Sequence, residues 1–252
     1  LQPIPQTNRS DTPTFGARYK MDGQPKQRIN KFLALQLGIS RRQADELIAS
    51  GKIFINEHGA TLGARFEPSD NIKLGDKIIS TTPEEKVYML FNKPRNYVCS
   101  RKKQGENETI YAILPKEFKA LKPVGRLDKD SSGLLLLTND GDFAFQMTHP
   151  KFYKVKQYDV GLNVPLEPLH QQMIADFGID LPDGKSQLGL EREDDSRKNW
   201  KVVMSEGRNR QIRRTFNALG YEVVSLHRFA LGGYNLPPDL EPGHFRPIKK
   251  TS

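Results

Sequence analysis

Apolar residues in the front part of the chain recur at the spacing of a helix face. They run from position 29 to position 37, and Gly38 follows where a left-handed cap is expected, so a helix is predicted up to that glycine. A second helix is predicted after Ser40, because residues 40–43 read Ser-Arg-Arg-Gln, the form of a capping box. Short strands separated by Gly and Asp turns are expected at 53–56 and 71–79.

Further along the chain, strand-like and helix-like runs are mixed without a regular alternation. Strands are predicted at 87–92, 134–138, 154–162 and 200–205. Helices are predicted at 142–147, 168–177 and 210–219. Because strands and helices do not repeat as strand-helix-strand units, the pattern favours an α+β domain with a largely antiparallel sheet over a doubly wound one.

These patterns divide the chain into four parts. Residues 1–25 are rich in Gln, Pro, Thr, Ser and Gly and are predicted to be a disordered tail. Residues 26–80 form a small α/β domain in this interpretation, and residues 81–86 carry no apolar side chain and are typical of a linker. A second, larger domain is expected over 87–250.

The charge of the chain narrows the class of partner. The 252 residues include 39 Lys+Arg against 30 Asp+Glu, a formal charge of +9, which attracts polyanions, nucleic acid first among them. No apolar run approaches the roughly 18 residues that span a membrane, so we expect a soluble protein with no membrane partner. A single cysteine, Cys99, fits a reducing compartment, and the cytoplasm is the expected location.

The first helices carry an excess of basic residues. Positions 26–52 hold six basic residues against two acidic ones, and Arg41 and Arg42 stand at the start of the second helix, where side chains and helix end together suit phosphate oxygens. The alternative is a merely solvated helix face. The order of residues in 28–33, 38–44 and 48–56 resembles the RNA-binding domain first described in ribosomal small-subunit protein four. The resemblance implies RNA binding through Arg28, Lys31, Arg41, Arg42 and Lys52.

The segment 125–133, Gly-Arg-Leu-Asp-Lys-Asp-Ser-Ser-Gly, admits three interpretations. A calcium loop fits the first positions, but its twelfth position is Asn139 rather than Glu. A structural turn before a buried strand is the second interpretation. The third is a catalytic carboxylate, Asp128, kept ionised in a partly dry pocket by arginines. Arg126 is one such arginine, and Arg213, which borders the apolar face of the 210–219 helix, is the candidate for the other.

Taken together, five motifs resemble the pseudouridine synthases, in the branch that acts on ribosomal RNA and carries the same front domain. They are Gly-Arg-Leu-Asp at 125–128, Ser-Gly-Leu-Leu at 132–135, Leu-Thr-Asn-Asp-Gly at 137–141, Lys-Gln-Tyr at 156–158 and Gly-Arg-Asn-Arg-Gln-Ile-Arg-Arg at 207–214. The resemblance implies that Asp128 is the catalytic aspartate, that Tyr158 stacks on the base, that Arg213 pairs with Asp128, and that Arg126 helps hold the extruded nucleotide. Arg210-Gln211 replaces the more common His-Gln of the last motif.

The implied fold is a central mixed, mainly antiparallel sheet with the active cleft across its middle. Further RNA contacts are expected from Lys156, Arg208, Arg210 and Arg214. The implied reaction is an isomerisation of uridine in ribosomal RNA, free or in a pre-ribosomal particle, by a monomer, and the large subunit is the favoured source of the substrate. Isomerisation needs no cofactor and no metal, and the sequence has no phosphate-binding glycine loop, dinucleotide fingerprint or His/Cys ligand cluster.

Two other classes of function compete with this interpretation. A non-catalytic ribosome-assembly factor would use both domains for RNA binding alone, but binding gives no reason for an acidic residue in a phosphate-facing cleft. A hydrolase of glycosidic bonds would need two carboxylates flanking the bond, and Asp128 and Asp130 alternate along the chain with Lys129 between them. Whether Asp128 adds covalently or removes a proton from the sugar is open at this stage.

Overall fold

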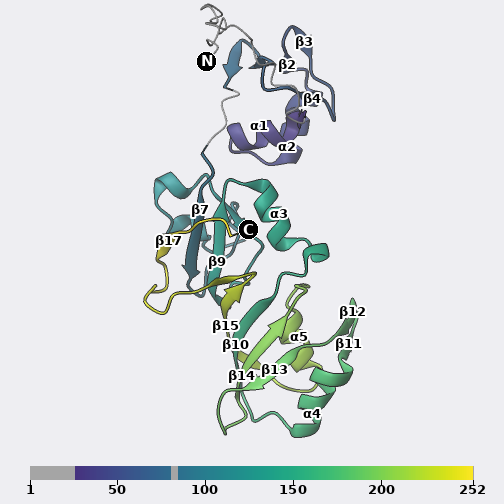
Figure 1. Ribbon diagram of the computed structural model, residues 1–252, viewed down its shortest axis with the longest axis vertical. Coiled ribbons are helices and arrows are strands. Elements are labelled where there is room, and N and C mark those ends of the chain that lie inside the picture. The colour runs from purple at the N-terminus through teal and green to yellow at the C-terminus, as the bar shows by residue number, and fades with distance from the viewer. Residues whose placement is uncertain (1–25, 81–84, 252) are drawn as a thin grey trace, which may run out of the picture. The chain divides into compact units, whose positions relative to one another are not determined.

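A computed structural model describes residues 26–80 and 85–251, and the chain divides into two compact units, Leu1–Pro83 and Glu84–Ser252 (Figure 1). The tail predicted at 1–25, and most of the linker predicted at 81–86, lie outside the described residues. No helix among the described residues is long and apolar enough to cross a membrane.

Over residues 26–80, the first unit has two short helices and six short strands. Its elements are β1 (Gln27–Arg28), α1 (Ile29–Gln36), α2 (Arg41–Ala49), β2 (Ile53–Ile55), β3 (His58–Gly59), β4 (Arg65–Phe66), β5 (Ile72–Leu74) and β6 (Lys77–Ile79). The strands β3, β2, β5 and β6 pair in that order as an antiparallel sheet, and β1 pairs with β4. The apolar faces of α1 and α2 pack with these strands into one core that includes Phe32, Leu33 and Ile48.

The predicted ends of the two helices are confirmed. The Ser40 side chain accepts a hydrogen bond from the backbone N–H of Gln43 at 3.1 Å, and the Gln43 side chain accepts one from the backbone N–H of Ser40 at 2.9 Å, so the capping box is complete. Gly38 has φ +65°, the left-handed conformation that ends α1.

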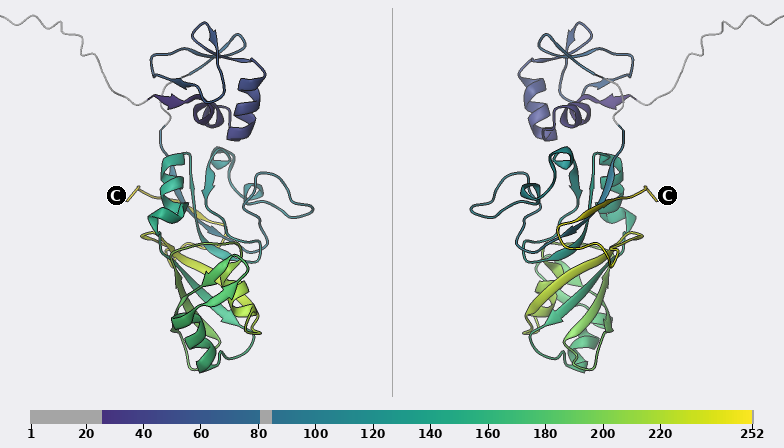
Figure 2. Two further views of the ribbon diagram at one scale, coloured as in Figure 1. Left: turned by 90° about the vertical axis from the view of Figure 1, so that its right-hand side faces the viewer. Right: turned by 90° about the vertical axis from the view of Figure 1, so that its left-hand side faces the viewer.

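The second unit is built on a sheet with short helices on both faces, so the predicted α+β class is confirmed. Its strands are β7 (Tyr88–Lys93), β8 (Lys122–Val124), β9 (Ser132–Thr138), β10 (Lys156–Leu162), β11 (Ile179–Leu181), β12 (Gly184–Ser186), β13 (Gly189–Arg192), β14 (Asn199–Met204), β15 (Val223–Leu231), β16 (Tyr234–Asn235) and β17 (Phe245–Pro247). Its helices are η1 (Ile110–Ala112), η2 (Lys116–Phe118), α3 (Gly141–Thr148), η3 (Pro150–Phe152), α4 (Pro168–Gln172), η4 (Met173–Phe177) and α5 (Gln211–Asn217). In both views of Figure 2, the loops between β7 and β8 project to one side of the sheet.

The main sheet has the strand order β13-β14-β10-β15-β9-β7-β17, with β16 paired to β15 and β8 to β9. All its strand pairs are antiparallel except β15 with β9, at its middle, where His227 lies opposite Ser132 and Arg228 opposite Gly133. Gly133 has φ +102°, and a Cβ atom there would lie 2.2 Å from the Arg228 carbonyl oxygen. Glycine is therefore required where the two halves of the sheet join.

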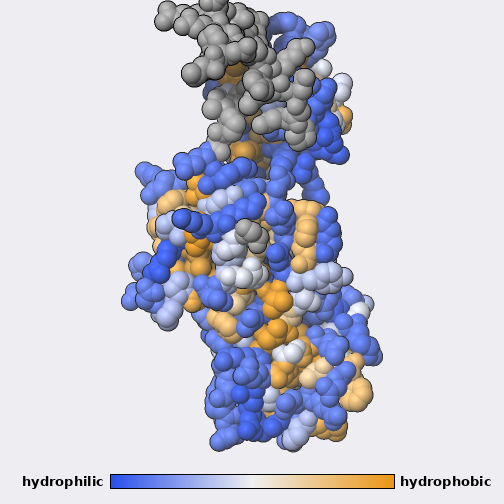
Figure 3. All heavy atoms as spheres, in the orientation of Figure 1, coloured by the Kyte–Doolittle hydropathy of each residue, from blue (hydrophilic) through white to orange (hydrophobic). Residues whose placement is uncertain are grey.

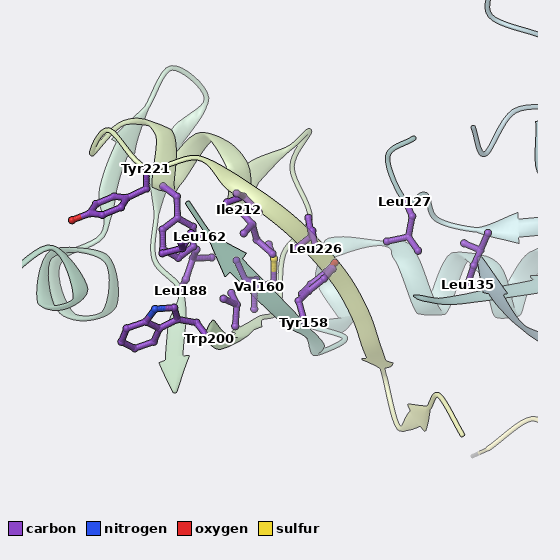
Figure 4. Packing of buried hydrophobic residues seen from close by; sticks show 14 of the residues in the cluster. Leu127, Leu135, Tyr158, Val160, Leu162, Leu188, Trp200, Ile212, Tyr221 and Leu226 are labelled. Carbon is purple, nitrogen blue, oxygen red and sulfur yellow. The ribbon is translucent and has the colours of Figure 1, made fainter. Parts of the chain in front are cut away.

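Alternate residues of β7 and β9 enter two cores, one on each face of the sheet. Phe91 and Leu135 belong to the core on one face, which continues as far as Phe216 of α5, while Leu134 packs on the other face with Phe143 of α3. Figure 4 shows the larger core between β10, β14 and α5, where Trp200, Val160 and Ile212 are buried together. On the face shown in Figure 3, hydrophobic residues of the second unit gather in a band between hydrophilic margins.

The largest difference from the predicted elements is β15, the nine-residue strand at the centre of the sheet, which the hydrophobic pattern did not indicate. His227 and Arg228 interrupt its apolar sequence, yet His227 is half-buried and Arg228 is buried. The short strands β8, β11 to β13, β16 and β17 were also missed. The predicted helix at 168–177 is confirmed as α4 continued by the π-helix η4.

Candidate active site

A cavity of about 440 Å³ opens in the second unit beside the junction of β9, β10 and β15. The cavity walls come from the segment before β9, the end of α3, the starts of β10 and α5, and β15. The sequence-predicted site residues that line it are Arg126, Asp128, Lys156, Tyr158, Arg208 and Arg210. Arg213 and Arg214 do not line it.

Asp128 lies on the connection between β8 and β9, which a buried lysine holds. The Nζ atom of Lys93 donates hydrogen bonds to the carbonyl oxygens of Pro94 at 3.0 Å, Asp128 at 3.1 Å and Ser131 at 2.8 Å. Lys93 is fully buried, and burial lowers its pKa although nearby acids oppose the shift. Leu127 is buried in the core, and both Leu127 and Asp128 line the cavity.

Two arginines and two aspartates form a charged cluster at this site, and two of the four, Asp128 and Arg210, line the cavity. Arg210 donates from both Nη atoms to the two carboxylate oxygens of Asp130, at 3.1 and 3.0 Å, and its Nη1 lies 3.6 Å from Oδ2 of Asp128. Arg213 places its Nε 3.2 Å from Oδ2 of Asp130 and donates to the carbonyl oxygens of Asp130 and Val223. The side chains of Asp128 and Asp130 are partly exposed, at 24% and 37%.

The pairing of Arg213 with Asp128 that the resemblance implied is therefore corrected. In the structure, Arg213 forms an ion pair with Asp130, and Asp128 forms one with Arg210. The reason is the position of Arg213, whose guanidinium is tied to the backbone at Val223 and Asp130 and lies behind the cavity wall. Burial opposes ionisation of Asp130, but the hydrogen bonds from Arg210 and the charges of Arg213 and Arg210 lower its pKa below the ordinary value of 3.8.

Tyr158 and Arg126 stand at different depths of the cavity. Tyr158 belongs to β10, is 7% exposed, and lies opposite Arg228 of β15 in the antiparallel register, so the two side chains share a face of the sheet. Figure 4 shows the Tyr158 ring beside Leu226, which also lines the cavity. Arg126 is exposed on the segment before Asp128. The ring is thus available at the floor and the Arg126 guanidinium at the rim.

Three of the cations predicted to contact RNA from the second unit bind other groups of the protein: Lys156 binds two backbone carbonyl oxygens, and Arg208 and Arg214 bind one turn. Lys156 donates to the carbonyl oxygens of Lys154 and Ser205, and burial, followed by the charge of Arg228, lowers its pKa. Arg208 and Arg214 both bind the turn between β11 and β12, where Asp183 accepts hydrogen bonds from each. The structure therefore assigns the guanidinium groups of Arg208 and Arg214 to bracing this turn.

In the first unit, the five residues predicted to contact RNA are all exposed: Arg28, Lys31, Arg41, Arg42 and Lys52. Arg41 reaches the Asn30 side chain at 3.4 Å, and Asn30 in turn donates to Asp45 at 2.8 Å. Exposure on and beside two adjacent helices fits contact with a polyanion.

Sequence reasoning missed two buried cations of the site, Lys93 and Arg228. Lys93 follows directly after the strand predicted at 87–92 and was given no role, and Arg228 lies in the strand that was not predicted. Arg228 is 3% exposed, lines the cavity, donates from Nε to the Leu134 carbonyl oxygen at 2.9 Å, and has no hydrogen-bond partner for its buried Nη2. The sequence signal is a charge at the end of an apolar strand for Lys93 and a charge inside one for Arg228.

The calcium-loop interpretation finds no support in the positions of the carboxylates. Asp130 is turned to Arg210 and Arg213, and within 26–80 and 85–251 no three His, Cys, Asp or Glu side chains gather in a way that would hold a metal ion. The second interpretation, a structural turn, agrees with the backbone, because the backbone N–H of Ser131 donates to the Asp128 carbonyl oxygen, as in a turn. The Asp128 carboxylate itself faces the cavity and Arg210.

Comparison with known proteins gives two matches to families along the chain. The family described as RNA pseudouridylate synthase matches residues 87–218, and the S4 domain matches residues 27–78.

Relatives of known name cover almost the whole chain. The chain is 36% identical to the ribosomal small subunit pseudouridine synthase A of Haemophilus influenzae over 89% of this chain and 97% of that protein. It is 35% identical to the ribosomal large subunit pseudouridine synthase B of Bacillus subtilis over 83% of this chain and 87% of that protein. A crystal structure of a pseudouridylate synthase, 36% identical, superposes with a TM-score of 0.63 over 88% of this chain and 96% of that one.

Proposed function

The chain belongs to the RNA pseudouridylate synthase family and is an RNA pseudouridine synthase with an S4 domain, and from this premise we propose that it isomerises a uridine of ribosomal RNA. The observation that carries the proposal is that Asp128, Tyr158 and Arg126, three positions singled out by their motifs, line one cavity of the family's domain. The names of the relatives supply the ribosomal RNA, free or in a pre-ribosomal particle.

The proposed reaction breaks the bond between N1 of the uracil and C1′ of the ribose and forms a bond between C5 and C1′. The proton on C5 is lost and N1 gains one, so substrate and product are isomers. Two acids line the cavity, Asp128 and Glu206. Asp128 is the proposed catalytic carboxylate, because it stands in the Gly-Arg-Leu-Asp motif beside Arg210, whereas the Glu206 carboxylate accepts hydrogen bonds from Arg208 and Gln211.

Tyr158 is the proposed floor of the base pocket. Its ring is buried beside Leu226, so a uracil flipped out of the RNA would stack on it away from water. Arg126 at the rim would fill the space that the flipped base leaves. Arg213 would act through Asp130 and hold the segment that carries Asp128.

The two sequence-predicted domains divide the work in this proposal. Residues 26–80 would grip phosphates through their exposed basic side chains, and residues 87–250 would carry out the isomerisation. The expected substrate was the large-subunit RNA. Relatives of nearly equal identity bear small-subunit and large-subunit names, so the test must include both RNAs.

The test is pseudouridine mapping by chemical adduct formation and primer extension on ribosomal RNA from cells with and without the gene. The expected result is one or more pseudouridine stops that vanish without the gene and return when purified protein acts on that RNA. An identical set of stops in both cell lines, with no tritium released from C5-tritiated small- and large-subunit transcripts, would contradict the proposal.

A further inference from the structure

Four exposed aromatic or basic side chains gather with a histidine where α3 ends and η3 begins. We call Phe145, His149, Lys151, Phe152 and Tyr153 the aromatic surface. Phe145, Phe152 and Tyr153 are 46%, 36% and 74% exposed, which is unusual for large apolar rings. In Figure 1, α3 and the turn that follows it lie along one side of the sheet.

Three rings of the aromatic surface, those of Phe145, His149 and Phe152, contact one another. Phe145 lies 4.6 Å from His149 and 5.8 Å from Phe152 between ring centroids, and the Lys151 ammonium lies 5.3 and 4.8 Å from the two phenylalanine rings. The His149 Nδ1 atom accepts a hydrogen bond from the Lys151 backbone N–H at 3.3 Å. These contacts order the three rings before any partner arrives, which lowers the entropy cost of binding.

The backbone places Tyr153 in solvent and ties the aromatic surface to the cavity. Tyr153 has φ +47°, a left-handed conformation rare for a residue that is not glycine. His149 itself lines the active-site cavity, and on both sides of Phe152 and Tyr153 the same segment lines it, through Pro150 and through Lys154. The aromatic surface is therefore continuous with the cavity rim.

We infer that the aromatic surface is a stacking site for an unpaired nucleotide next to the target uridine, an inference that rests on the proposed function. A uridine that enters the cavity leaves its neighbour in the strand without a stacking partner, and exposed rings at the rim replace that partner. Base-aromatic stacking accepts any base, so this surface would add affinity without reading sequence.

The charges around the rings favour RNA over an apolar protein segment as the partner. Residues 143–158 contain three lysines and no Asp or Glu. Lys151 is exposed over the rings, and Lys154 lines the cavity rim, so cations alternate with aromatic side chains. This combination is typical of sites that bind single-stranded nucleic acid.

The test compares Phe152→Leu/Tyr153→Leu with Phe152→Tyr/Tyr153→Phe, which keeps both rings. Phe177→Leu is the matched control, because Phe177 is 65% exposed on η4 and lies outside the cavity lining. The first readout is kcat and KM for tritium release from C5-tritiated ribosomal RNA transcripts. The second is the Kd for a twelve-residue oligouridylate measured by fluorescence anisotropy, which needs no turnover.

The leucine pair is expected to raise KM and the oligouridylate Kd about 5- to 20-fold while kcat stays within about twofold, because stacking contributes equally before and during the reaction. The ring-keeping pair and Phe177→Leu should match the wild type. KM and Kd unchanged in the leucine pair would overturn the inference. If the wild type releases no tritium, the proposed function fails, and the oligouridylate measurement still decides the stacking site. Should the pair unfold, Tyr153→Leu alone gives the same comparison.

Discussion

The Nζ atom of Lys93 lies 3.1 Å from the carbonyl oxygen of Asp128, so the last residue of β7 holds the backbone of the proposed catalytic residue. The same ammonium also binds the carbonyl oxygens of Pro94 and Ser131. A fully buried cation thereby binds the backbone of the segment between β8 and β9, and the position of Asp128 depends on these hydrogen bonds.

Replacement of Lys93 by methionine is expected to lower both stability and activity. The variant keeps the bulk of the side chain but leaves three carbonyl oxygens without this donor, at a cost of about 2 to 4 kcal/mol in the free energy of unfolding. Urea unfolding measures that cost, and kcat for tritium release measures the displacement of Asp128. Lys119→Met, at an exposed position, is the control and should change neither quantity. A fully stable Lys93→Met enzyme would refute the role given to this lysine.

Arg210 is expected to matter more for turnover than its neighbour in α5, Arg214. Arg210 contacts both Asp128 and Asp130, whereas Arg214 binds Asp183 outside the cavity lining. Arg210→Met should lower kcat by about 10-fold or more, because two carboxylates lose their shared cation. Single-turnover rates on tritiated transcript provide the measurement. Equal effects of Arg210→Met and Arg214→Met on the single-turnover rate would argue against a role for the charged cluster of Asp128, Asp130, Arg210 and Arg213.

The free energy of unfolding at acidic pH should depend on the ionisation of Asp130. Its folded pKa is lowered by Arg210 and Arg213 against the opposing effect of burial, so its stabilising contribution is present above the unfolded value near 3.8. That contribution is lost as the pH falls through the lower, folded pKa. In urea unfolding, wild type is expected to exceed Asp130→Asn in stability at pH 5, and the difference should shrink as the pH falls to 3 and below. A difference that stays constant over this range would mean that Asp130 does not titrate as described.

The first unit should control the salt dependence of RNA binding. Arg41→Gln/Arg42→Gln removes two exposed cations. If both contact phosphates, the negative slope of log K against log salt concentration should become shallower by about 2. Titrations of a ribosomal RNA transcript at several salt concentrations give the slope. Lys103→Gln removes a cation that pairs with Glu108 and should leave the slope in place. A double variant with the wild-type slope would place the phosphate contacts elsewhere.

Local signals predicted the first unit well. The capping box at Ser40 and the glycine at position 38 act within a few residues of themselves, so their outcome is visible in the sequence. The centre of the second sheet was different. Its longest strand holds His227 and Arg228, whose burial depends on β9 and β10, far away in the chain. A charge inside an apolar strand has meaning only once its partners are known.

The candidate site shows the same limit. Motif positions predicted Asp128, Tyr158 and Arg126 as neighbours, and the cavity contains all three. The partner of Asp128 was wrong, because Arg210 and Arg213 lie one helical turn apart and the sequence does not tell which of them reaches the cavity. Side-chain direction, set by packing of α5 against β15 and by the backbone at Val223, decided it.

The most direct test of the account is tritium release from C5-tritiated ribosomal RNA transcript by Asp128→Asn. This change keeps the size of the side chain and removes the charge that faces the cavity. The variant is expected to unfold at a urea concentration close to that of the wild type and to bind the transcript with an unchanged Kd, while releasing no tritium above the no-enzyme background. Turnover by Asp128→Asn at a rate comparable to wild type would contradict the assignment of Asp128 as the catalytic carboxylate.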